Sequence, residues 1–480
     1  MCLYNTRTLI ALSLLLTSCT VGPKYTKPDI PAAPTYSEPP PASFQESQGW
    51  KAAEPNDAAI RGRWWELFGD AQLNALQTQI DPANQTLQTA EANFRQARLA
   101  IQVNRSSLYP TITAQPSITA NRLSQNRPLG TYPGVYGDYL APVTVGWEID
   151  LWGRIRRGIA AAREQLQASA ADVENTKLEL HAEVATDYFE AHSLDAQKQL
   201  LNDTVVAYRK ALELTQNRYK GGIATKSDVA QAATQLEQTE AQDVDVGVAR
   251  AQYQHAIAVL LGKDPERFEL PVAPLRNAPP EVPLGVPSQL LERRPDIAAA
   301  ERRTAAANEQ IGIARAAFFP TLMISASGGF EGTNLVNWFV WPSRFWSVGP
   351  QLTETIFDAA RRRAQVQTAQ AAYEAAVATY RQTALSAFQE VEDSLSTLRL
   401  LEEESAKQQE ATAAAELSLQ LSLNRYRGGL VTYLEVITAQ STALTNERAT
   451  VDLLRRRMDA SVQLIKALGG GWDTSKLPKA

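Results

Sequence analysis

Two stretches of the chain carry the hydrophobic spacing of very long helices. Residues 361–427 contain no Gly or Pro, and small or apolar residues recur along them at alternating intervals of four and three. This spacing is that of a coiled-coil seam, formed by Tyr373, Val377, Tyr380, Ala384, Ala387, Val391, Ser394, Leu398 and Leu401. Gly428-Gly429 ends the run, and a second Gly- and Pro-free run, 432–468, turns back. We therefore predict a helical hairpin over 361–468, about 100 Å long at 1.5 Å per residue.

The first half of the chain has the same plan. A run broken only by Gly158 leads to Gly221-Gly222 and then returns, which predicts a hairpin over 154–261. Shorter helical patterns precede both hairpins, and Pro110 and Pro320 end them. In each half the short helix and the returning helix together are roughly as long as the long helix. We therefore expect the two shorter helices to stack end to end beside the long one.

Four segments alternate between apolar and polar residues with a period of two, which predicts strands at about 111–121, 139–151, 321–331 and 345–357. In the second segment the apolar set includes Tyr139 and Trp147, and the polar set includes Thr144 and Asp150. Alternation with aromatic residues near the strand ends is typical of membrane barrels. A soluble two-layer sheet uses the same alternation, so the pattern alone leaves both open.

The order of short helix, two strands, long helix and returning helix occurs twice. Arg218-Tyr-Lys-Gly-Gly-Ile-Ala-Thr225 matches Arg425-Tyr-Arg-Gly-Gly-Leu-Val-Thr432, which indicates an internal two-fold repeat. Four strands cannot close, and lipid does not tolerate an open sheet edge, so a membrane-spanning form must oligomerise. The predicted parts are a signal peptide 1–18, an extended Pro-rich segment 19–56, a first repeat 57–262, a connector 263–287, a second repeat 288–469 and a tail 470–480.

The N-terminus has the pattern of a bacterial lipoprotein signal. Arg7 precedes an apolar run at 9–16, and small residues follow it. Leu16-Thr-Ser-Cys19 resembles the lipobox, in which the cysteine is lipidated and becomes the first mature residue. An ordinary signal peptide with a coincidental cysteine is the alternative. In lipoproteins an Asp after the cysteine signals retention in the inner membrane, so Thr20 favours the outer membrane.

Composition excludes several functional classes. The 47 basic and 52 acidic residues give a net charge of −5, which offers no surface for nucleic acid. The mean hydropathy of −0.27 argues against a multi-helix membrane protein. His181 and His192 lie too far apart along one helix to share a metal, and His255 stands alone. We find no phosphate loop and no nucleophile elbow, so we expect neither an enzyme nor a cofactor.

Four short motifs resemble one protein family. They are Val21-Gly-Pro-Lys-Tyr25, Trp64-Trp-Glu-Leu-Phe-Gly-Asp70, Arg294-Pro-Asp-Ile297 and Ala316-Ala-Phe-Phe-Pro320. All resemble outer-membrane efflux lipoproteins of the TolC type, in the OprM/NodT-like branch that works with RND (resistance-nodulation-division) pumps. The resemblance implies a mostly α fold with membrane β. Three chains would share one 12-stranded β-barrel, four strands from each, continued by a long α-helical coiled-coil tunnel into the periplasm.

The resemblance also implies a function. The homotrimer would be a passive export conduit for drugs and toxic compounds. A periplasmic adaptor would connect it to an inner-membrane RND transporter, and outer-membrane lipid would surround it. The alternative is a lipid-anchored periplasmic adaptor or a structural coiled-coil protein. An adaptor typically has one hairpin flanked by small β-domains, whereas two hairpins and four strands are predicted here.

In this family the hairpin turns are the periplasmic tips, where the adaptor docks and where links between helices hold the channel shut. The matching docking positions are Gly221, Gly222, Ile223, Gly428, Gly429 and Leu430. The matching capping and link positions are Arg218, Thr225, Asp228, Arg425, Thr432 and Glu435. The Thr-x-x-Asp and Thr-x-x-Glu spacings also fit plain capping boxes, in which the Thr and acid side chains bond backbone amides reciprocally.

The family constricts its tunnel just before the second tip. Here Glu416, Gln420 and Leu423 lie at i, i+4 and i+7 on one helix face, with Asn424 beside them. Several relatives place carboxylates at the narrowest ring, which favours cations. In this chain we expect a mixed apolar and amide plug instead. The alternative is that Leu423 is only a residue of the coiled-coil seam. Glu354 falls on the apolar face of the fourth strand, and we expect it below the lipid.

Overall fold

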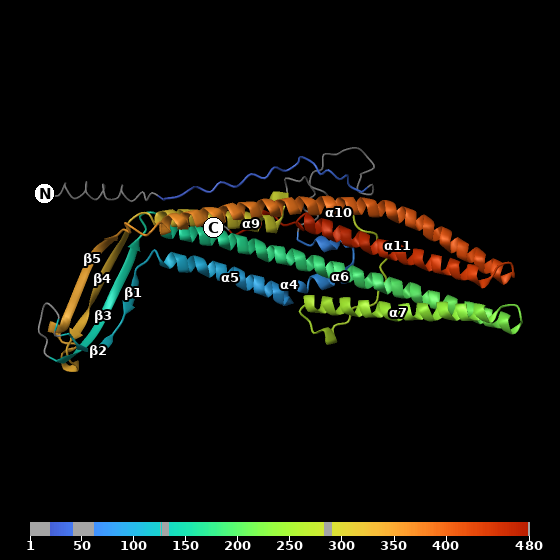
Figure 1. The fold of residues 1–480 in the computed structure, drawn as a ribbon, viewed down its shortest axis with the longest axis horizontal. Coiled ribbons are helices and arrows are strands. Elements are labelled where there is room, and N and C mark those ends of the chain that lie inside the picture. The colour runs from blue at the N-terminus through green and yellow to red at the C-terminus, as the bar shows by residue number, and fades with distance from the viewer. Residues whose placement is uncertain (1–19, 42–61, 125, 127–133, 283–289, 479–480) are drawn as a thin grey trace.

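The computed structural model describes residues 20–41, 62–124, 126, 134–282 and 290–478. They form a long rod with a small sheet at one end and two helical hairpin tips at the other (Figure 1). The helices are α3 Ala71–Gln77, α4 Ile80–Ala83, α5 Gln85–Ser106, α6 Arg154–Lys220, α7 Lys226–Leu260, α8 Leu290–Arg293, α9 Pro295–Ala316, α10 Arg361–Arg427 and α11 Tyr433–Ala467. The strands are β1 Thr111–Ala114, β2 Ser117–Arg122, β3 Val135–Ile149, β4 Thr321–Gly332 and β5 Arg344–Thr353. Short 3-10 turns are η2 Trp64–Phe68, η3 Pro265–Arg267, η5 Leu335–Asn337, η6 Trp341–Ser343 and η7 Thr474–Lys476.

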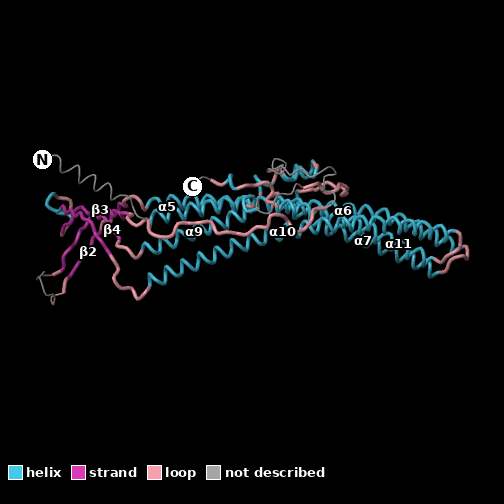
Figure 2. Tube along the Cα trace, turned by 90° about the horizontal axis from the view of Figure 1, so that it is seen from above, coloured by secondary structure: helices cyan, strands magenta, loops and turns pink. Residues whose placement is uncertain are grey.

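The long helices have matching lengths in the two halves of the chain. α6 and α10 each have 67 residues, α7 and α11 each have 35, and α5 and α9 each have 22. α5 and α7 follow one another along α6, and α9 and α11 follow one another along α10 (Figures 1 and 2). α6 continues through Gly158. A β-carbon at this position would lie 3.2 Å from the Asn104 side chain of α5. The glycine therefore allows these two helices to approach closely.

The sheet differs from the prediction mainly at one interruption and at two strand ends. Its antiparallel order is β1-β3-β4-β5, and β2 also pairs with β3. The predicted strand 111–121 is interrupted at Gln115-Pro116, because Pro116 has no N–H to donate to the ladder. The Gln115 N–H still bonds the Pro142 carbonyl at 3.3 Å, so β1 and β2 form one broken ribbon. β3 begins at Val135 rather than 139, and β5 ends at Thr353 rather than 357.

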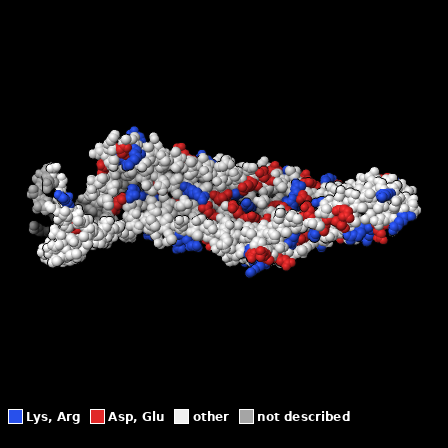
Figure 3. Space-filling model, turned by 60° about the horizontal axis from the view of Figure 1, so that its bottom comes forward, with Lys and Arg blue, Asp and Glu red and all other residues white. Residues whose placement is uncertain are grey.

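The two faces of this sheet have opposite character. The register aligns Val145, Ala326 and Val348 on one face and Thr144, Ser327 and Ser347 on the other. The first, apolar face is open to the surroundings, with Trp346 78% and Leu352 67% exposed. The face of the molecule drawn in Figure 3 has few charged side chains at the sheet end and many over the helical body. Glu354 lies beyond the end of β5, in the segment that leads to α10.

The main core lies near mid-length, where η2 and α3 pack against α6, α7 and α11. His181 stacks on Trp65 at 4.3 Å and its Nδ1 pairs with the Gln77 side chain at 2.5 Å. His192 Nδ1 pairs with the buried Asp195 at 3.1 Å. Both histidines are therefore held by hydrogen bonds inside the core. Among the described residues, no group of His, Cys, Asp and Glu side chains could hold a metal ion, and no helix is long and apolar enough to cross a membrane.

Carboxylates of α6 and α11 gather beside this core. Arg455 of α11 donates to Glu190 at 2.5 Å and to Asp459 at 2.9 Å. Burial, with the added charges of Glu183 and Glu190, raises the pKa of Asp187 to about 7. Burial and the charge of Glu190 likewise raise the pKa of Asp459 to about 7. Two carboxyl groups at mid-length therefore change charge near neutral pH.

Residues 20–41 run as an extended segment along the helices (Figure 1). The Val21 N–H donates to the Trp152 carbonyl at 3.2 Å, which fixes the start of the segment where β3 meets α6. Farther along, the Tyr25 hydroxyl donates to Glu301 at 2.5 Å, and the Ser37 and Glu38 amides donate to Glu392. The predictions for residues 1–19, which include Cys19, and for 42–56 lie outside the described residues.

Candidate functional site

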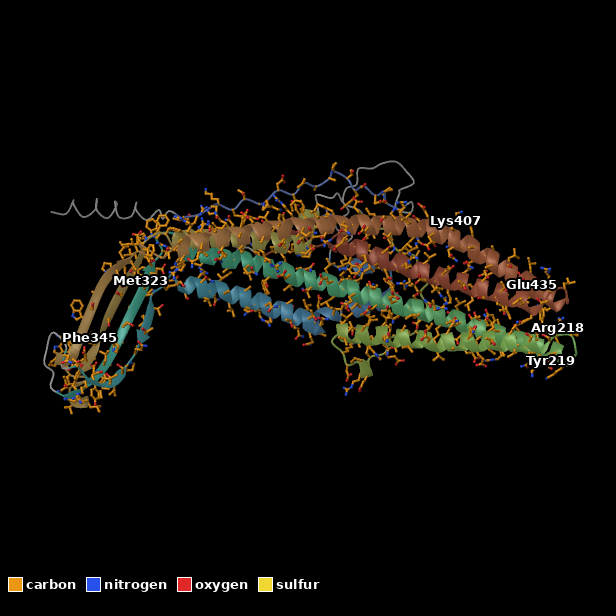
Figure 4. The ribbon with its side chains drawn as sticks, viewed as in Figure 1. Arg218, Tyr219, Met323, Phe345, Lys407 and Glu435 are labelled. Atoms are coloured by element: carbon orange, nitrogen blue, oxygen red, sulfur yellow. The ribbon has the colours of Figure 1, made fainter. Side chains whose placement is uncertain are left out.

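Both hairpins end in the same backbone turn at the end of the rod away from the sheet (Figure 4). Gly222 has φ +72° and Gly429 has φ +75°, a left-handed conformation that favours glycine. After each of them an amide reaches back: Ile223 N–H to the Arg218 carbonyl at 2.8 Å, and Leu430 N–H to the Arg425 carbonyl at 2.9 Å. These are Schellman caps, which satisfy the last carbonyls of α6 and α10.

The other two predicted docking glycines have a different role. Gly221 and Gly428 have φ of −82° and −75°, which any residue can adopt. A β-carbon on either would make only ordinary contacts, at 3.5 Å or more. The backbone therefore does not require glycine at these positions, and both glycines are exposed. Ile223 and Leu430 project beside them, 70% and 76% exposed, as an apolar pair open to a partner.

Arg218 links the first hairpin to the second. Its Nη1 donates to the Tyr426 carbonyl at 2.9 Å and to the Arg427 carbonyl at 3.2 Å, at the C-terminal end of α10. The guanidinium carbon also lies 4.6 Å from the centre of the Tyr426 ring. The cation thus bonds two carbonyls at the end of α10, of which that of Tyr426 also accepts the Gly429 N–H at 2.9 Å. It also opposes the negative end of the helix dipole and stacks on an aromatic ring.

The equivalent residues of the second tip behave differently. Arg425 approaches Glu435 at 3.6 Å within its own hairpin, and both side chains are about half exposed. At the first tip Thr225 and Asp228 form the predicted capping box, with hydrogen bonds of 3.1 and 2.8 Å. The predicted second box is wrong, because in the described part of the chain the Thr432 side chain makes no cap hydrogen bond. The longer Glu435 side chain approaches Arg425 instead, and its amide bonds the Thr432 carbonyl at 3.3 Å.

A buried cluster joins the two hairpins just behind the tips. It contains Tyr426, Tyr433, Val436 and Ala232, which come from α10, α11 and α7. The rings of Tyr426 and Tyr433 lie 5.2 Å apart, and burial raises the pKa of Tyr433 to about 12. Four helices contribute to this cluster when the partly buried leucines of α6 are included. The tips are therefore packed together as well as bonded.

The four predicted constriction residues do not share one environment. Leu423 is half-buried and packs against the tip cluster, whereas Glu416, Gln420 and Asn424 are exposed. Burial, aided by the charge of Glu416, raises the pKa of Glu447 on α11, so the Glu416 face of α10 adjoins α11. Sequence reasoning missed Leu417 and Leu421, which are 55% and 53% exposed on α10. Their spacing of four beside the predicted constriction was the available signal.

A polar groove lies farther from the tips, between the two hairpins. It has a volume of about 410 Å³ and is open on one side. Its lining side chains are mostly amides and hydroxyls from α6, α7 and α11, with one half-buried cation and one acid: Gln197, Gln235, Gln238, Thr239, Gln242, Ser441, Thr445, Arg448 and Asp452. No nucleophile with an adjacent base appears among these lining residues. The groove thus offers weak polar contacts rather than a reactive centre.

Comparisons with known proteins agree on one family. The outer membrane efflux protein family matches residues 78–263 and 286–470. Outer membrane protein OprJ of Pseudomonas aeruginosa is 32% identical over 97% of this chain and 96% of its own. The toluene efflux pump outer membrane protein TtgC of Pseudomonas putida is 30% identical over 97% and 96%. The solved outer-membrane channel OprN superposes with a TM-score of 0.83 at 28% identity, covering 95% of this chain and all of its own.

Proposed function

This chain belongs to the outer membrane efflux protein family, and from that premise we propose that it is the outer-membrane channel of a tripartite efflux pump. One observation carries the proposal. One elongated chain has a sheet with an exposed apolar face at one end and two linked Gly-Gly tips at the other (Figure 1). Such a body can sit in lipid at one end and reach a partner across an aqueous space at the other.

We propose that three copies share one 12-stranded barrel. Each chain supplies four ribbons, and the outer edges of the β1–β2 ribbon and of β5 have no strand beside them in the described sheet. Unpaired edges are not stable in lipid, so they must pair with other copies. With the apolar face outward, the polar face that carries Thr144, Ser327 and Ser347 lines a water-filled pore. The two halves of each chain, which form an internal repeat, then contribute matching sets of helices to the tunnel wall.

At the other end the tips receive a periplasmic adaptor, which connects the channel to an inner-membrane RND transporter. The exposed pair Ile223 and Leu430 supplies apolar contact area, and Gly221 and Gly428 let another backbone approach closely. Transport through the tunnel is passive, because the transporter supplies the energy. We assign no catalytic step to this chain. Its cargo is small molecules of the kind that efflux pumps export, such as drugs and toxic compounds.

The resting channel is held shut near the tips. Arg218 supplies the principal link, supported by the Arg425–Glu435 pair and by the capping pair Thr225–Asp228. Around a threefold axis Gln420 and Asn424, which are exposed, would form amide rings, with Glu416 one turn farther from the tip. Leu423 contributes from the packed side of α10. The plug is therefore mixed amide and apolar rather than a ring of carboxylates.

Cys19 carries the lipid anchor. Val21, two positions after Cys19 in the sequence, is bonded where β3 meets α6, at the level at which the sheet gives way to helices. That level is the periplasmic surface of the outer membrane in the proposed orientation. A single acyl chain binds a membrane only marginally, so the barrel and the acyl chains together hold the protein in place.

Efflux in intact cells tests the proposal. Deleting the gene should raise the accumulation of a fluorescent efflux substrate, and the full chain should restore its export. The protein should stay in outer membranes washed with alkaline carbonate and leave them only with detergent. Release by carbonate alone would instead favour a lipid-anchored adaptor or a peripheral coiled-coil protein. Normal accumulation in the deletion strain, with other pumps removed, would contradict the proposal.

A further inference from the structure

The connection between β4 and β5, residues 333–343, is a compact apolar segment at the end of the sheet away from the helices. It is closed on itself: the Asn334 side chain accepts from the Asn337 N–H at 2.9 Å, and the Ser343 hydroxyl donates to the Asn337 carbonyl at 2.5 Å. Large apolar side chains nevertheless face outward, at exposures of 68% for Leu335, 85% for Val336, 63% for Phe339 and 73% for Trp341. A distal loop in water would expose few such residues.

The segment lies over the apolar face of the sheet. Gly332 belongs to that face, and a β-carbon on it would lie 3.0 Å from the Asn337 carbonyl oxygen and 3.1 Å from the Trp338 α-carbon. Gly137 of β3 belongs to the same face, and a β-carbon there would lie 2.9 Å from the Thr333 carbonyl oxygen. Both glycines therefore make room for the connection to fold back across the sheet.

Aromatic contacts make the segment continuous with that face. The Trp338 ring meets Tyr139 edge-on at 5.6 Å, and Phe339 meets Phe330 at 5.6 Å. Tyr139 and Phe330 both carry their side chains on the apolar face. Arg344 follows on the same face, with its guanidinium carbon 3.5 Å from the centre of the Trp341 ring. Met323 and Phe345, labelled in Figure 4, belong by register to the opposite face.

We propose that residues 333–343 lie in the extracellular leaflet of the outer membrane, at the boundary between acyl chains and phosphate-bearing headgroups. The inference rests on the proposed barrel. Along β4 the apolar face runs from Leu322 to Phe330, which is about 26 Å of strand and about 20 Å of height after a tilt of ~40°. A barrel's apolar band is about 25 Å tall. The apolar face of β4 therefore spans most of this band. Arg344 pairs with Phe330 at the far end of the face, so its cation stands where acyl chains give way to anionic headgroups, and the segment that folds back beside it adds apolar side chains at that level.

A second copy of the segment is the competing occupant of this surface. In the proposed barrel the polar face surrounds the threefold axis, and the segment lies on the other side of the sheet. Three copies of the segment are therefore held apart by the barrel wall and cannot meet as a plug at the channel mouth. Continuity with the lipid-facing side chains Tyr139 and Phe330 favours lipid as the occupant.

Cysteine labelling in intact cells tests the inference. The chain's two cysteines are Cys2 and Cys19, so the unsubstituted protein gives the background. Val336→Cys places a thiol on the segment, and Asn126→Cys places one on the exposed part of the β2–β3 connection. With a membrane-impermeant maleimide, Asn126→Cys should react in intact cells. Val336→Cys should not react with the maleimide in intact cells, and it should react once detergent is added.

Three results are distinguishable. Labelling of Val336→Cys in intact cells at the rate of Asn126→Cys would overturn the inference. Protection of Val336→Cys together with cross-linking between copies by a short bismaleimide would assign the surface to a second copy, which also overturns it. Val348→Cys, on the apolar face of β5, reports on the barrel itself. If Val348→Cys also reacts in intact cells, the proposed barrel fails; if it stays protected while Val336→Cys reacts, only the inference fails.

Discussion

Removing the Arg218 side chain should loosen the closed tips. Hydrogen bonds from a charged donor contribute about 1.5–3 kcal/mol each, and a cation over an aromatic ring contributes about 0.5–2 kcal/mol. These terms act on one half-buried group and are not additive. We therefore expect Arg218→Ala to remove about 2 kcal/mol of linkage per chain, a shift of up to about 30-fold between linked and separated tips.

Single-channel conductance in planar bilayers measures this shift. The unsubstituted channel should show small conductance, and Arg218→Ala should show larger steps or long-lived open periods. Arg218→Lys should fall between the two, because lysine keeps the charge but loses the planar fork. Tyr426→Leu should raise conductance less than Arg218→Ala, because it removes the ring under the guanidinium but leaves both backbone carbonyls that Arg218 bonds. Tyr426→Phe should leave conductance unchanged, because the Tyr426 hydroxyl has no hydrogen-bond partner among the described residues.

Arg425→Ala is the matched control, since it removes the same charge at the equivalent position of the second repeat. Its exposed pair with Glu435 is worth at most about 1 kcal/mol. Conductance should therefore rise far less than in Arg218→Ala. The reasoning is refuted if Arg425→Ala opens the channel more than Arg218→Ala does, or if Arg218→Ala assembles normally and conducts like the unsubstituted protein.

Four further expectations follow from the same structure. Leu423→Ser should raise conductance, and Gln420→Asp should create block by multivalent cations added on the periplasmic side. If Leu423→Ser leaves conductance unchanged but weakens the trimer, Leu423 is a packing residue only. Gly221→Gln should impair efflux while the trimer and the melting temperature stay intact, because the φ of Gly221 suits any residue; a collapse of trimer yield would assign this glycine to folding. Asp187→Asn should raise the melting temperature more at pH 8 than at pH 5, because a carboxyl with its pKa raised to about 7 contributes its full stability only below its unfolded value near 3.9 and loses it as the pH rises through 7; an equal shift at both pH values would contradict the titration. Cys19→Ser should abolish incorporation of labelled palmitate but not membrane insertion, and persistence of the label would place the lipid elsewhere.

The long helices and the strand faces could be predicted because each depends on local pattern. The absence of Pro and the four-three spacing are sufficient for α10, and alternation is sufficient for the faces of β3 and β4. The break at Pro116 was visible in the residue type, but the alternation on either side of it concealed the interruption. The apolar composition of 333–343 was equally visible, yet its folding back depends on the space above Gly332 and Gly137.

The asymmetry of the two tips could not be predicted, because the sequence repeats the same residues. Tyr219 is 46% exposed, whereas Tyr426, its equivalent, is 4% exposed and lies under Arg218. Which tyrosine is covered depends on how one hairpin packs against the other, a contact between residues more than 200 positions apart in the chain. The absence of the second capping box has a local cause, since the Glu435 side chain approaches Arg425 of its own hairpin.

The central claim is that three chains close one barrel, and cross-linking of the sheet edges tests it most directly. Ile112 lies on β1 and Val348 on β5, and within one chain three strand spacings, about 14 Å, separate them. A chain that carries both Ile112→Cys and Val348→Cys, treated in outer membranes with a lipid-soluble thiol cross-linker shorter than that distance, should give covalent species of two and three chains and nothing larger. Only single chains in an efflux-competent strain, or a ladder that continues beyond three, would contradict the account.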